Sequence, residues 1–380
     1  MNLDQLRNEI DLIDDKILEL FAARMGISGA IAEFKAKSNM PVRDSHRERQ
    51  KLLDISEKAG SGLSSYAVIL YSLIMELSRS YQERLLNPSC ELKEKILSAI
   101  EATDKLFTQQ AVVACQGIEG AYSQLACEKF FKLPNIMYFT TWDGVFSAIE
   151  NGLCRYGVLP LENSTAGTVN RIYDLMMRYN FSIVRSVRLK VDHNLLAKKG
   201  SSISEIREIY SHEQAFNQCA EFIKTLGNIK ITVCENTAVA ARMVAQSDRN
   251  DVAAISSSHC AAIYGLSNIA SSIQDQDNNY TRFICISKKL EIYPGADKTS
   301  IMMILPHKPG SLYRVLACFY ALGINLVKLE SRPLPSREFE FMFYFDLETS
   351  VYSNEYAELM CRLSALCEEF KYLGSYSEIV

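Results

Sequence analysis

A heptad-like repeat of apolar residues at the start of the chain constrains the fold more than any other feature. The repeat consists of Leu3, Leu6, Ile10, Ile13, Ile17, Leu20, Ile27, Ile31 and Phe34. Its missing member falls at Arg24, and Lys35, eleven positions later, returns to within roughly 20° of the same helix face. A guanidinium keeps its charge, so burying it on an apolar seam is costly unless an anion meets it. The pattern predicts a long helix over residues 3–37 that carries either a pocket for a small dianion or a charged residue that fixes the register of paired helices.

Residues 1–90 carry helical periodicity and predict an all-helical domain. Pro41 ends the first helix, a short second helix starts near Asp44, and Gly60 separates it from a third over residues 64–86. Three helices of unequal length, the first about 50 Å long, make a poor core for a monomer. We therefore expect an intertwined three-helix homodimer, or a higher homo-oligomer.

After residue 90 the pattern of apolar residues changes twice along the chain. After a polar helical linker over residues 91–110, short β-rich runs alternate with helices over residues 111–290, which predicts an α/β domain. The extended run 182–197 predicts a crossover between two lobes, with a return crossing near Thr281. Residues 298–380 carry strand, helix, strand, strand, helix and strand, the ferredoxin-like α+β order.

Composition excludes several classes of protein. The net charge is -4 and the pI about 5.9, which argues against a nucleic-acid partner. We expect no membrane-spanning segment, because no run of eighteen or more apolar residues occurs, and the acidic start does not resemble a signal peptide. The 11 cysteines are scattered without a CxxC motif, so we expect buried thiols in a reducing cytoplasm, with neither disulfides nor a zinc site.

The helical segment offers more polar residues for the same site. Glu48 lies on the first turns of the second helix, and Ser78 and Gln82 are four apart on the third, hence on one face. Arg7 precedes Arg24 by seventeen residues, about 100° off its face, so we expect Arg7 to reach the site of a partner chain.

Five short motifs here resemble the all-helical chorismate mutase family. They read LxxLRxEID around Arg7, RM at 24–25, IAEFK ending at Lys35, PVRD at 41–44 and RERQ at 47–50. The resemblance implies substrate contacts at Arg7, Arg24, Lys35, Asp44, Arg47, Glu48, Ser78 and Gln82.

The resemblance implies a Claisen rearrangement of chorismate to prephenate, which needs no cofactor or metal. Arg24 and the Arg7 of a partner chain would hold the two carboxylates, and Lys35 and Gln82 would donate hydrogen bonds to the ether oxygen. Glu48 would meet the ring hydroxyl.

Three further positions have competing interpretations. The family would use Asp44 to order the cations and would line its pocket with Arg47 and Ser78. Asp44 is equally typical of a helix cap, Ser78 of a helix surface, and an Arg47–Glu48 neighbour pair of a solvated face.

Four motifs stand out in the α/β segment, and each has a plain structural alternative. GIEGAYS (117–123) is a turn into a helix that could offer N–H groups to an anion, and PLENSTAGTV (160–169) is a polar loop. SHEQAFNQC (211–219) starts a helix, where His212 is more often structural than catalytic, and NYTRF (279–283) precedes a strand.

In this order and with these intervals, the four motifs resemble the prephenate dehydratase family. The resemblance implies two α/β lobes, like a periplasmic binding protein, with prephenate in the cleft losing CO2 and its ring hydroxyl. Thr281 is then the catalytic residue that assists the departing hydroxyl. The implied substrate-binding residues are Glu162, Asn163, Ser164, Ser211, Gln214, Gln218, Thr281, Arg282 and Phe283. Glu162 is a candidate acid or orienting group, Arg282 either pairs with a carboxylate or is structural, and Phe283 would pack the cleft wall.

The C-terminal segment carries HKPGSLYRVL and LESRP at its first turn and second strand. ESRP resembles the phenylalanine-binding ACT domain; the turn reads GSL where that family has GAL. A plain ferredoxin-like domain is the alternative. The resemblance implies that L-phenylalanine inhibits the enzyme from a site between paired domains at Gly310, Ser311, Leu312, Glu330, Ser331, Arg332 and Pro333.

Together these resemblances predict a bifunctional chorismate mutase and prephenate dehydratase with a regulatory domain. A mutase fused to a prephenate dehydrogenase would need a GxGxxG nucleotide fingerprint, which is absent from the sequence. A non-catalytic sensor of an amino acid or aromatic acid would have lost catalytic positions, yet Arg24, Lys35, Glu48, Gln82 and Thr281 are all present.

Overall fold

A computed structural model describes the chain except residues 1, 39, 43, 87–89, 335–339 and 380. It divides into two compact units. The helical unit holds residues 1–94 with 360–362, and the α/β unit holds 95–359 with 363–380.

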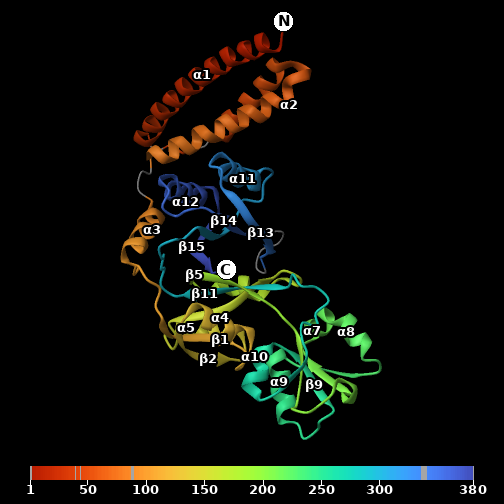
Figure 1. Cartoon of the computed structure of the whole chain (residues 1–380). Coiled ribbons are helices and arrows are strands. Elements are labelled where there is room, and N and C mark those ends of the chain that lie inside the picture. The colour runs from red at the N-terminus through yellow and green to blue at the C-terminus, as the bar shows by residue number, and fades with distance from the viewer. Residues whose placement is uncertain (1, 39, 43, 87–89, 335–339, 380) are drawn as a thin grey trace. The chain divides into compact units, whose positions relative to one another are not determined.

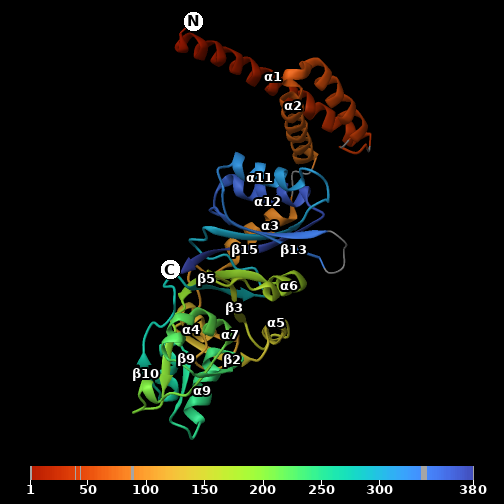
Figure 2. The ribbon, with the colours of Figure 1, turned by 90° about the vertical axis from the view of Figure 1, so that its right-hand side faces the viewer.

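The helical unit is built from α1 (Leu3–Lys37) and α2 (Ser45–Leu86). Asn2 caps α1 by accepting a hydrogen bond from the Gln5 N–H at 2.9 Å. Gly60, with φ 70° and ψ 170°, breaks α2 into the two predicted segments. Figure 2 shows the N-terminal half of α1 running clear of α2. The apolar seam of α1 consequently lies open in the single chain, with Leu20 70% exposed.

One stretch of α2 bears on the prediction that no segment spans a membrane. Within the described residues, the helix over His46–Gln82 is long and apolar enough to cross a membrane by length and composition alone, with a mean hydropathy of 1.2. Its break at Gly60 and the ion pair between Glu48 and Arg79 favour a helix packed in a bundle.

The α/β unit contains a ten-stranded sheet in the order β13-β14-β12-β15-β5-β11-β3-β1-β2, with β4 paired to β3. Its strands are β1 (Gln110–Gln116), β2 (Leu133–Phe139), β3 (Tyr156–Asn163), β4 (Gly167–Thr168), β5 (Ser182–Lys190), β11 (Tyr280–Ser287), β12 (Lys298–Ile304), β13 (Asn325–Pro333), β14 (Phe341–Glu348) and β15 (Glu369–Ile379). The helices beside its first-lobe strands β1–β5 and β11 are α4 (Tyr122–Phe130), α5 (Trp142–Glu150) and α6 (Asn170–Arg178). Before them, α3 (Glu91–Ala102) fills much of the predicted linker.

The second lobe has its own five-stranded sheet, in the order β10-β6-β9-β7-β8. The strands are β6 (Asn194–Ala197), β7 (Glu208–Ser211), β8 (Lys230–Val233), β9 (Val252–Ser256) and β10 (Ser267–Ala270). The helical segments are a 3-10 turn (Ile203–Glu205), α7 (Glu213–Gln218), α8 (Ala220–Thr225), α9 (Thr237–Gln246) and α10 (Ser258–Tyr264). Figure 1 shows α9 and α10 beside β9. The predicted crossover over 182–197 is present as β5 and β6.

The C-terminal domain follows the predicted order β12-α11-β13-β14-α12-β15, with α11 (Ser311–Ala321) and α12 (Asn354–Leu366). The sheet of this domain continues into the first lobe, because β15 pairs in parallel with β5. Gly374 allows this approach: its φ is +132°, and a Cβ there would collide with the carbonyl oxygen of Ile183.

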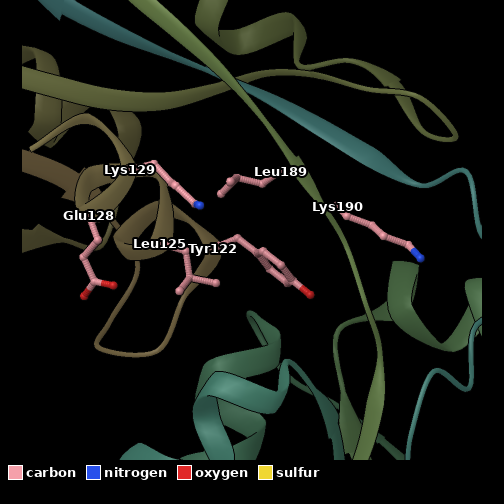
Figure 3. A pocket seen from close by; sticks show the side chains of 6 residues that line it. All are labelled: Tyr122, Leu125, Glu128, Lys129, Leu189 and Lys190. Carbon is pink, nitrogen blue, oxygen red and sulfur yellow. The ribbon is translucent and has the colours of Figure 1, made fainter. Parts of the chain in front are cut away.

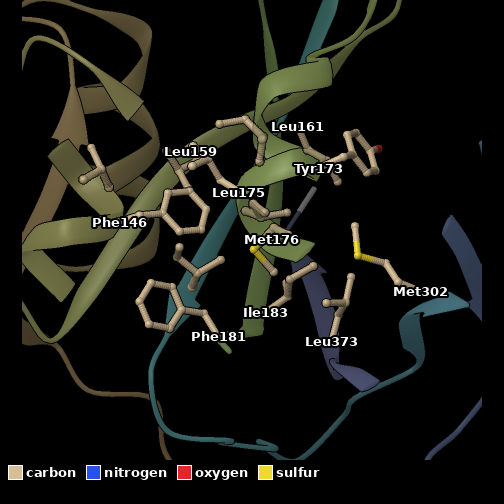
Figure 4. Packing of buried hydrophobic residues seen from close by; sticks show 14 of the residues in the cluster. Phe146, Leu159, Leu161, Tyr173, Leu175, Met176, Phe181, Ile183, Met302 and Leu373 are labelled. Atoms are coloured by element: carbon tan, nitrogen blue, oxygen red, sulfur yellow. The ribbon is translucent and has the colours of Figure 1, made fainter. Parts of the chain in front are cut away.

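One hydrophobic core spans the first lobe and the C-terminal domain. Phe146, Phe181 and Ile183 of the lobe belong to the same buried cluster as Met302 and Leu373 (Figure 4). The predicted segments 111–290 and 298–380 therefore share one core and one sheet, and both lie within the α/β unit apart from residues 360–362.

The cysteine prediction is wrong at one pair. Cys90 and Cys361, 271 residues apart in sequence, form a disulfide. None of the other nine described cysteines forms a disulfide, and eight of these are buried, as expected for small apolar side chains. Sequence spacing gave no signal for the pair, because neither partner lies in a local motif.

Candidate active site

The helical unit brings Arg24 and Ser78 together. The Nη1 of Arg24 donates to the Ser78 hydroxyl and lies 3.4 Å from the carbonyl oxygen of Ile74. Ser78 is buried and the Arg24 residue is half-buried, although the neighbouring seam residues of α1 are exposed. The guanidinium thus lies against α2.

Three more predicted residues point inward from the same pair of helices. Gln82 is 7% exposed, and its Oε1 has no hydrogen-bond partner among the described residues. Lys35 donates to the carbonyl oxygen of Val42, and Glu48 pairs with Arg79. The sequence analysis did not single out Arg79, since a lone arginine on a helix carries no motif.

The remaining predicted residues of this site have other roles in the single chain. Asp44 caps α2 by accepting a hydrogen bond from the Arg47 N–H at 3.0 Å, and this bond lowers the pKa of the Asp44 carboxyl. Arg47 is exposed. Arg7 is also exposed and lies 3.6 Å from Asp4. The cap is the structural alternative named above for Asp44.

In the α/β unit, β11 separates the predicted residues onto two faces. Successive side chains on a strand point to opposite sides, so Thr281 and Phe283 share one face and Arg282 takes the other. Asn163 pairs with Thr281 across β3 and β11, and its Nδ2 donates to the Thr281 Oγ1 at 2.8 Å. Thr281 and Asn163 thus form the centre of the candidate site.

Arg282 and Glu162 lie on the face opposite Thr281, where Arg282 pairs with carboxylates of the protein itself, and their contacts with the substrate stay predictions. Arg282 is 6% exposed, and its Nη1 lies 3.0 Å from the Glu162 carboxylate and 2.5 Å from that of Asp346 in the C-terminal domain. Lys328 also pairs with Glu162.

Glu162 does not have the protonation state of an acid catalyst. Burial acts to raise the pKa of Glu162, but the hydrogen bond from Lys328 and the charge of Arg282 outweigh it and hold the pKa below its usual range. The carboxylate is therefore ionised near neutral pH.

Two more residues that were predicted to contact the substrate are buried in the protein interior. Phe283 is 2% exposed and packs in the core of the first lobe instead of the cleft wall. Ser211 is fully buried and donates to the carbonyl oxygen of Ile255 at 2.7 Å. His212 caps α7 by accepting from the Gln214 N–H, which is its structural alternative.

The other predicted residues gather where the two lobes meet. Gln218 donates through Nε2 to Thr165 Oγ1 at 2.8 Å, and Thr165 donates to Asn163 Oδ1 at 2.7 Å. Ser164 donates to the carbonyl oxygen of Asn278 at 2.7 Å. Gln214 is half-buried on α7.

Sequence reasoning missed three members of this hydrogen-bonded group. Thr165 and Asn279 lie inside the quoted ENST and NYTRF motifs, and His193 lies in the crossover. Their place within these segments was the available signal, but the roles of individual hydroxyls and amides depend on contacts across the fold.

The GIEGAYS loop does not present a free anion site at Gly120. The Gly120 N–H donates to Gln124 Oε1 at 2.7 Å, and its carbonyl accepts from the Cys260 thiol at 3.2 Å. A Cβ at Gly120 would lie 2.8 Å from the Cys260 sulfur, so glycine permits this contact between lobes.

A shallow pocket of about 320 Å³ lies beside α4 and β5 (Figure 3). It is lined by Tyr122, Leu125, Glu128, Lys129, Leu189 and Lys190. None of these is a predicted site residue. The Tyr122 hydroxyl is committed to the backbone of Asp192, with O–O and N–O distances of 2.9 Å.

The predicted effector residues of β13 also divide between two faces. Glu330 accepts from Thr168 at 3.1 Å and Arg332 donates to Asp174 at 3.1 Å, so both side chains face the first lobe. Ser331 and Pro333 are exposed on the other face.

The predicted turn of this domain has the expected special backbone. Gly310 has φ +84° just before α11, and the buried Ser311 hydroxyl has no hydrogen-bond partner among the described residues. Leu312 beside it is half-buried.

Two known families match this chain. Residues 6–83 match the model of chorismate mutase type II, and residues 113–291 match that of prephenate dehydratase. These ranges contain the Arg24 cluster and the Thr281 cluster respectively.

Relatives match over most of the chain. The bifunctional chorismate mutase/prephenate dehydratase of Aquifex aeolicus is 30% identical over 378 residues, covering 98% of this chain and 97% of the relative. An arogenate dehydratase/prephenate dehydratase of Arabidopsis thaliana, a chloroplastic protein, is 38% identical over 315 residues, covering 80% of this chain and 81% of the relative.

A solved structure matches the α/β part. The prephenate dehydratase of Arthrobacter aurescens in complex with L-Phe has a TM-score of 0.64 and 26% identity, covering 70% of this chain and 89% of that one. The near full-length match and both family models assign the chain: it belongs to the family of bifunctional chorismate mutase/prephenate dehydratases, which convert chorismate to prephenate and prephenate to phenylpyruvate in phenylalanine biosynthesis.

Proposed function

We propose that the helical unit rearranges chorismate at a site built from Arg24, Lys35, Glu48 and Gln82 and completed by Arg7 of a second copy of the chain. Among the described residues, Arg24 has hydrogen bonds only through Nη1, so its other nitrogens remain for a carboxylate. Gln82 is buried in the same bundle, and its Oε1 has no hydrogen-bond partner among the described residues. The free guanidinium nitrogens of Arg24 and the amide Nε2 of Gln82 are donors that can hold a compact conformer and stabilise charge on the ether oxygen.

The exposed seam of α1 supports a homodimer. Residues that follow the heptad pattern, such as Ile10 and Ile17, are 56% and 58% exposed in the single chain. Apolar faces of this length are buried in paired helices. Arg7 belongs to the same exposed half of α1, which gives it access to a partner's site.

Subunit mixing tests this arrangement. We expect Arg7→Ala and Arg24→Ala each to abolish prephenate formation. Dimers reassembled from equal amounts of the two variants should regain about a quarter of wild-type activity, because half are mixed and each mixed dimer has one intact site. No recovery from refolded mixed dimers would place both arginines in the same chain's site.

For the second reaction, we propose that Thr281 donates a hydrogen bond to the ring hydroxyl of prephenate. The bond between the ring and its carboxylate breaks and releases CO2, and the electron pair enters the ring. The ring C–O bond then breaks, and the leaving hydroxide takes up a proton and departs as water. Asn163, Ser164, Gln214 and Gln218 would orient the substrate.

The observation that carries this proposal is the 2.8 Å hydrogen bond from Asn163 to Thr281 Oγ1. It uses the acceptor side of the hydroxyl and leaves its hydrogen for a ligand. We expect Thr281→Val to lower phenylpyruvate formation by roughly a hundredfold or more, and to leave prephenate formation from chorismate unchanged. Thr281→Ser should retain a measurable part of the activity. Near-normal turnover by Thr281→Val would remove Thr281 from the mechanism.

We also propose that the C-terminal domain is an ACT domain, and that L-phenylalanine binds between two such domains at residues 310–312 and 330–333 and inhibits dehydration. The contacts of Glu330 and Arg332 with the first lobe give such binding a route to the catalytic lobe. The L-Phe complex of the Arthrobacter relative supports the same effector. Saturating phenylalanine should lower phenylpyruvate formation, and Gly310→Val should weaken that inhibition.

We place the enzyme in the cytoplasm as part of this proposal. A purified chain that binds phenylalanine yet turns over neither chorismate nor prephenate would instead favour the non-catalytic sensor.

A further inference from the structure

A buried histidine begins a chain of hydrogen bonds that ends on the Thr281 hydroxyl. His193 lies in the crossover between β5 and β6 and is 3% exposed. Its Nε2 lies 2.8 Å from Gln218 Oε1, and its Nδ1 has no hydrogen-bond partner among the described residues. Since an amide oxygen only accepts, Nε2 carries the hydrogen. Burial lowers the pKa of His193, consistent with a neutral ring.

The amides that follow have a defined direction. Gln218 Oε1 also accepts from Asn279 Nδ2 at 3.0 Å, and Asn279 Oδ1 accepts from Asn163 Nδ2 at 2.7 Å. Thr165 joins the two ends, because it accepts from Gln218 and donates to Asn163. Reversing one amide alone would set donor against donor or acceptor against acceptor.

The direction matters at the last link. Because the Asn163 Nδ2 faces Thr281, its Oγ1 acts as an acceptor there and keeps its hydrogen. A reversed Asn163 amide would present Oδ1 and take that hydrogen, and Thr281 would then have none to offer a departing hydroxyl.

We propose that Asn279 and His193 are positioning residues for dehydration: through Gln218 they hold the Asn163 amide so that the Thr281 hydroxyl donates toward the substrate. This inference rests on the proposed role of Thr281. Neither residue is assigned a contact with the substrate.

Paired variants of the full-length enzyme test the acceptor at position 279. Asn279→Leu removes it, and we expect kcat for prephenate to fall about tenfold while KM changes less than about threefold. Asn279→Asp keeps an oxygen facing the Asn163 Nδ2 but loses the donor to Gln218 Oε1, so it should recover only part of the lost kcat. Asn151→Leu, an amide removed from the exposed end of α5, is the matched control and should leave kcat unchanged.

The donor at position 193 is tested in the same way. His193→Leu removes the donor to Gln218 and should lower kcat about threefold, whereas His193→Gln can place an amide nitrogen near the former Nε2 and should restore it. The fluorescence of Trp142 reports whether the α/β unit of each variant is folded. If Asn279→Leu does not fold, the kcat values of His193→Leu and His193→Gln decide whether the inference holds.

Three results would overturn the inference: both leucine variants folded with kcat unchanged, an Asn279→Asp loss as large as that of Asn279→Leu, or a change confined to KM. Thr281→Val separates this outcome from failure of the proposed function. If Thr281→Val loses turnover while both leucine variants keep a normal kcat, only the positioning roles of Asn279 and His193 are refuted. If Thr281→Val turns over normally, the proposed role of Thr281 is refuted as well.

Discussion

The buried ion pair between Arg282 and Asp346 predicts a large loss of stability on removing the arginine. Arg282→Met leaves Asp346, 2% exposed, with the Ser300 hydroxyl but without its cation. Breaking a buried pair from one side costs about 3–5 kcal/mol, because the remaining charge stays away from water. At roughly 2–4 °C per kcal/mol, the melting temperature of the α/β unit should fall by roughly 10 °C.

The single tryptophan makes this measurable in the full chain. Trp142 packs against the core shared by the first lobe and the C-terminal domain, so its fluorescence follows unfolding of the α/β unit. Arg171→Met is the matched control, because its pair with Asp143 is about half-exposed on both sides, so its loss should lower the stability far less than Arg282→Met does.

A double variant shows whether the stability loss of Arg282→Met comes from the unpaired charge of Asp346 or from the changed side-chain volume. Arg282→Met combined with Asp346→Asn removes both charges, and the combined loss should be clearly smaller than the sum of the single losses. Additive losses, or an Arg282→Met variant as stable as Arg171→Met, would refute the reasoning.

Three smaller predictions follow. Gly374→Ala should cost roughly 2–4 kcal/mol in urea unfolding, because its positive φ and the adjacent β5 carbonyl exclude a Cβ, whereas Gly152→Ala, with open space around it, should cost about 1 kcal/mol. Ion pairs and hydrogen bonds hold the pKa of Glu208 at about 2 against 4.5. Its stabilisation is therefore present above pH 4.5 and lost as the pH falls toward 2, so Glu208→Gln should flatten the acid limb of the stability curve measured by Trp fluorescence. Tyr122→Phe removes both hydrogen bonds to the Asp192 backbone and should cost about 1–2 kcal/mol, with faster proteolysis at the crossover.

The features predicted well from the sequence are those that depend on the periodicity of apolar residues within a single helix or strand. The seam of α1 indicated a single helix, and the break at Gly60 divides α2 as expected. The strand and helix order of residues 298–380 was likewise readable, because each element carries its own apolar pattern.

The features that could not be predicted from the sequence depend on contacts between distant segments. Glu162 and Arg282 adjoin Asn163 and Thr281 in sequence, yet adjacent strand residues face opposite sides, so the two pairs do not share one face. Which side faces the C-terminal domain is decided by partners such as Asp346, 64 residues from Arg282. No local pattern carries that information.

This geometry connects the C-terminal domain directly to β11. Thr281 and Arg282 are consecutive on β11, one in the hydrogen-bonded group between the lobes and the other paired with Asp346. If β14 shifted while β11 stayed in place, Arg282 and Asp346 would each be buried without an ion-pair partner. The loss of stability would be comparable to that of Arg282→Met. Small movements of the domain are therefore favoured when β11 moves with them. If phenylalanine binds as proposed and prefers one position of the domain, it would displace Thr281 through the neighbouring Arg282, without itself reaching the cleft.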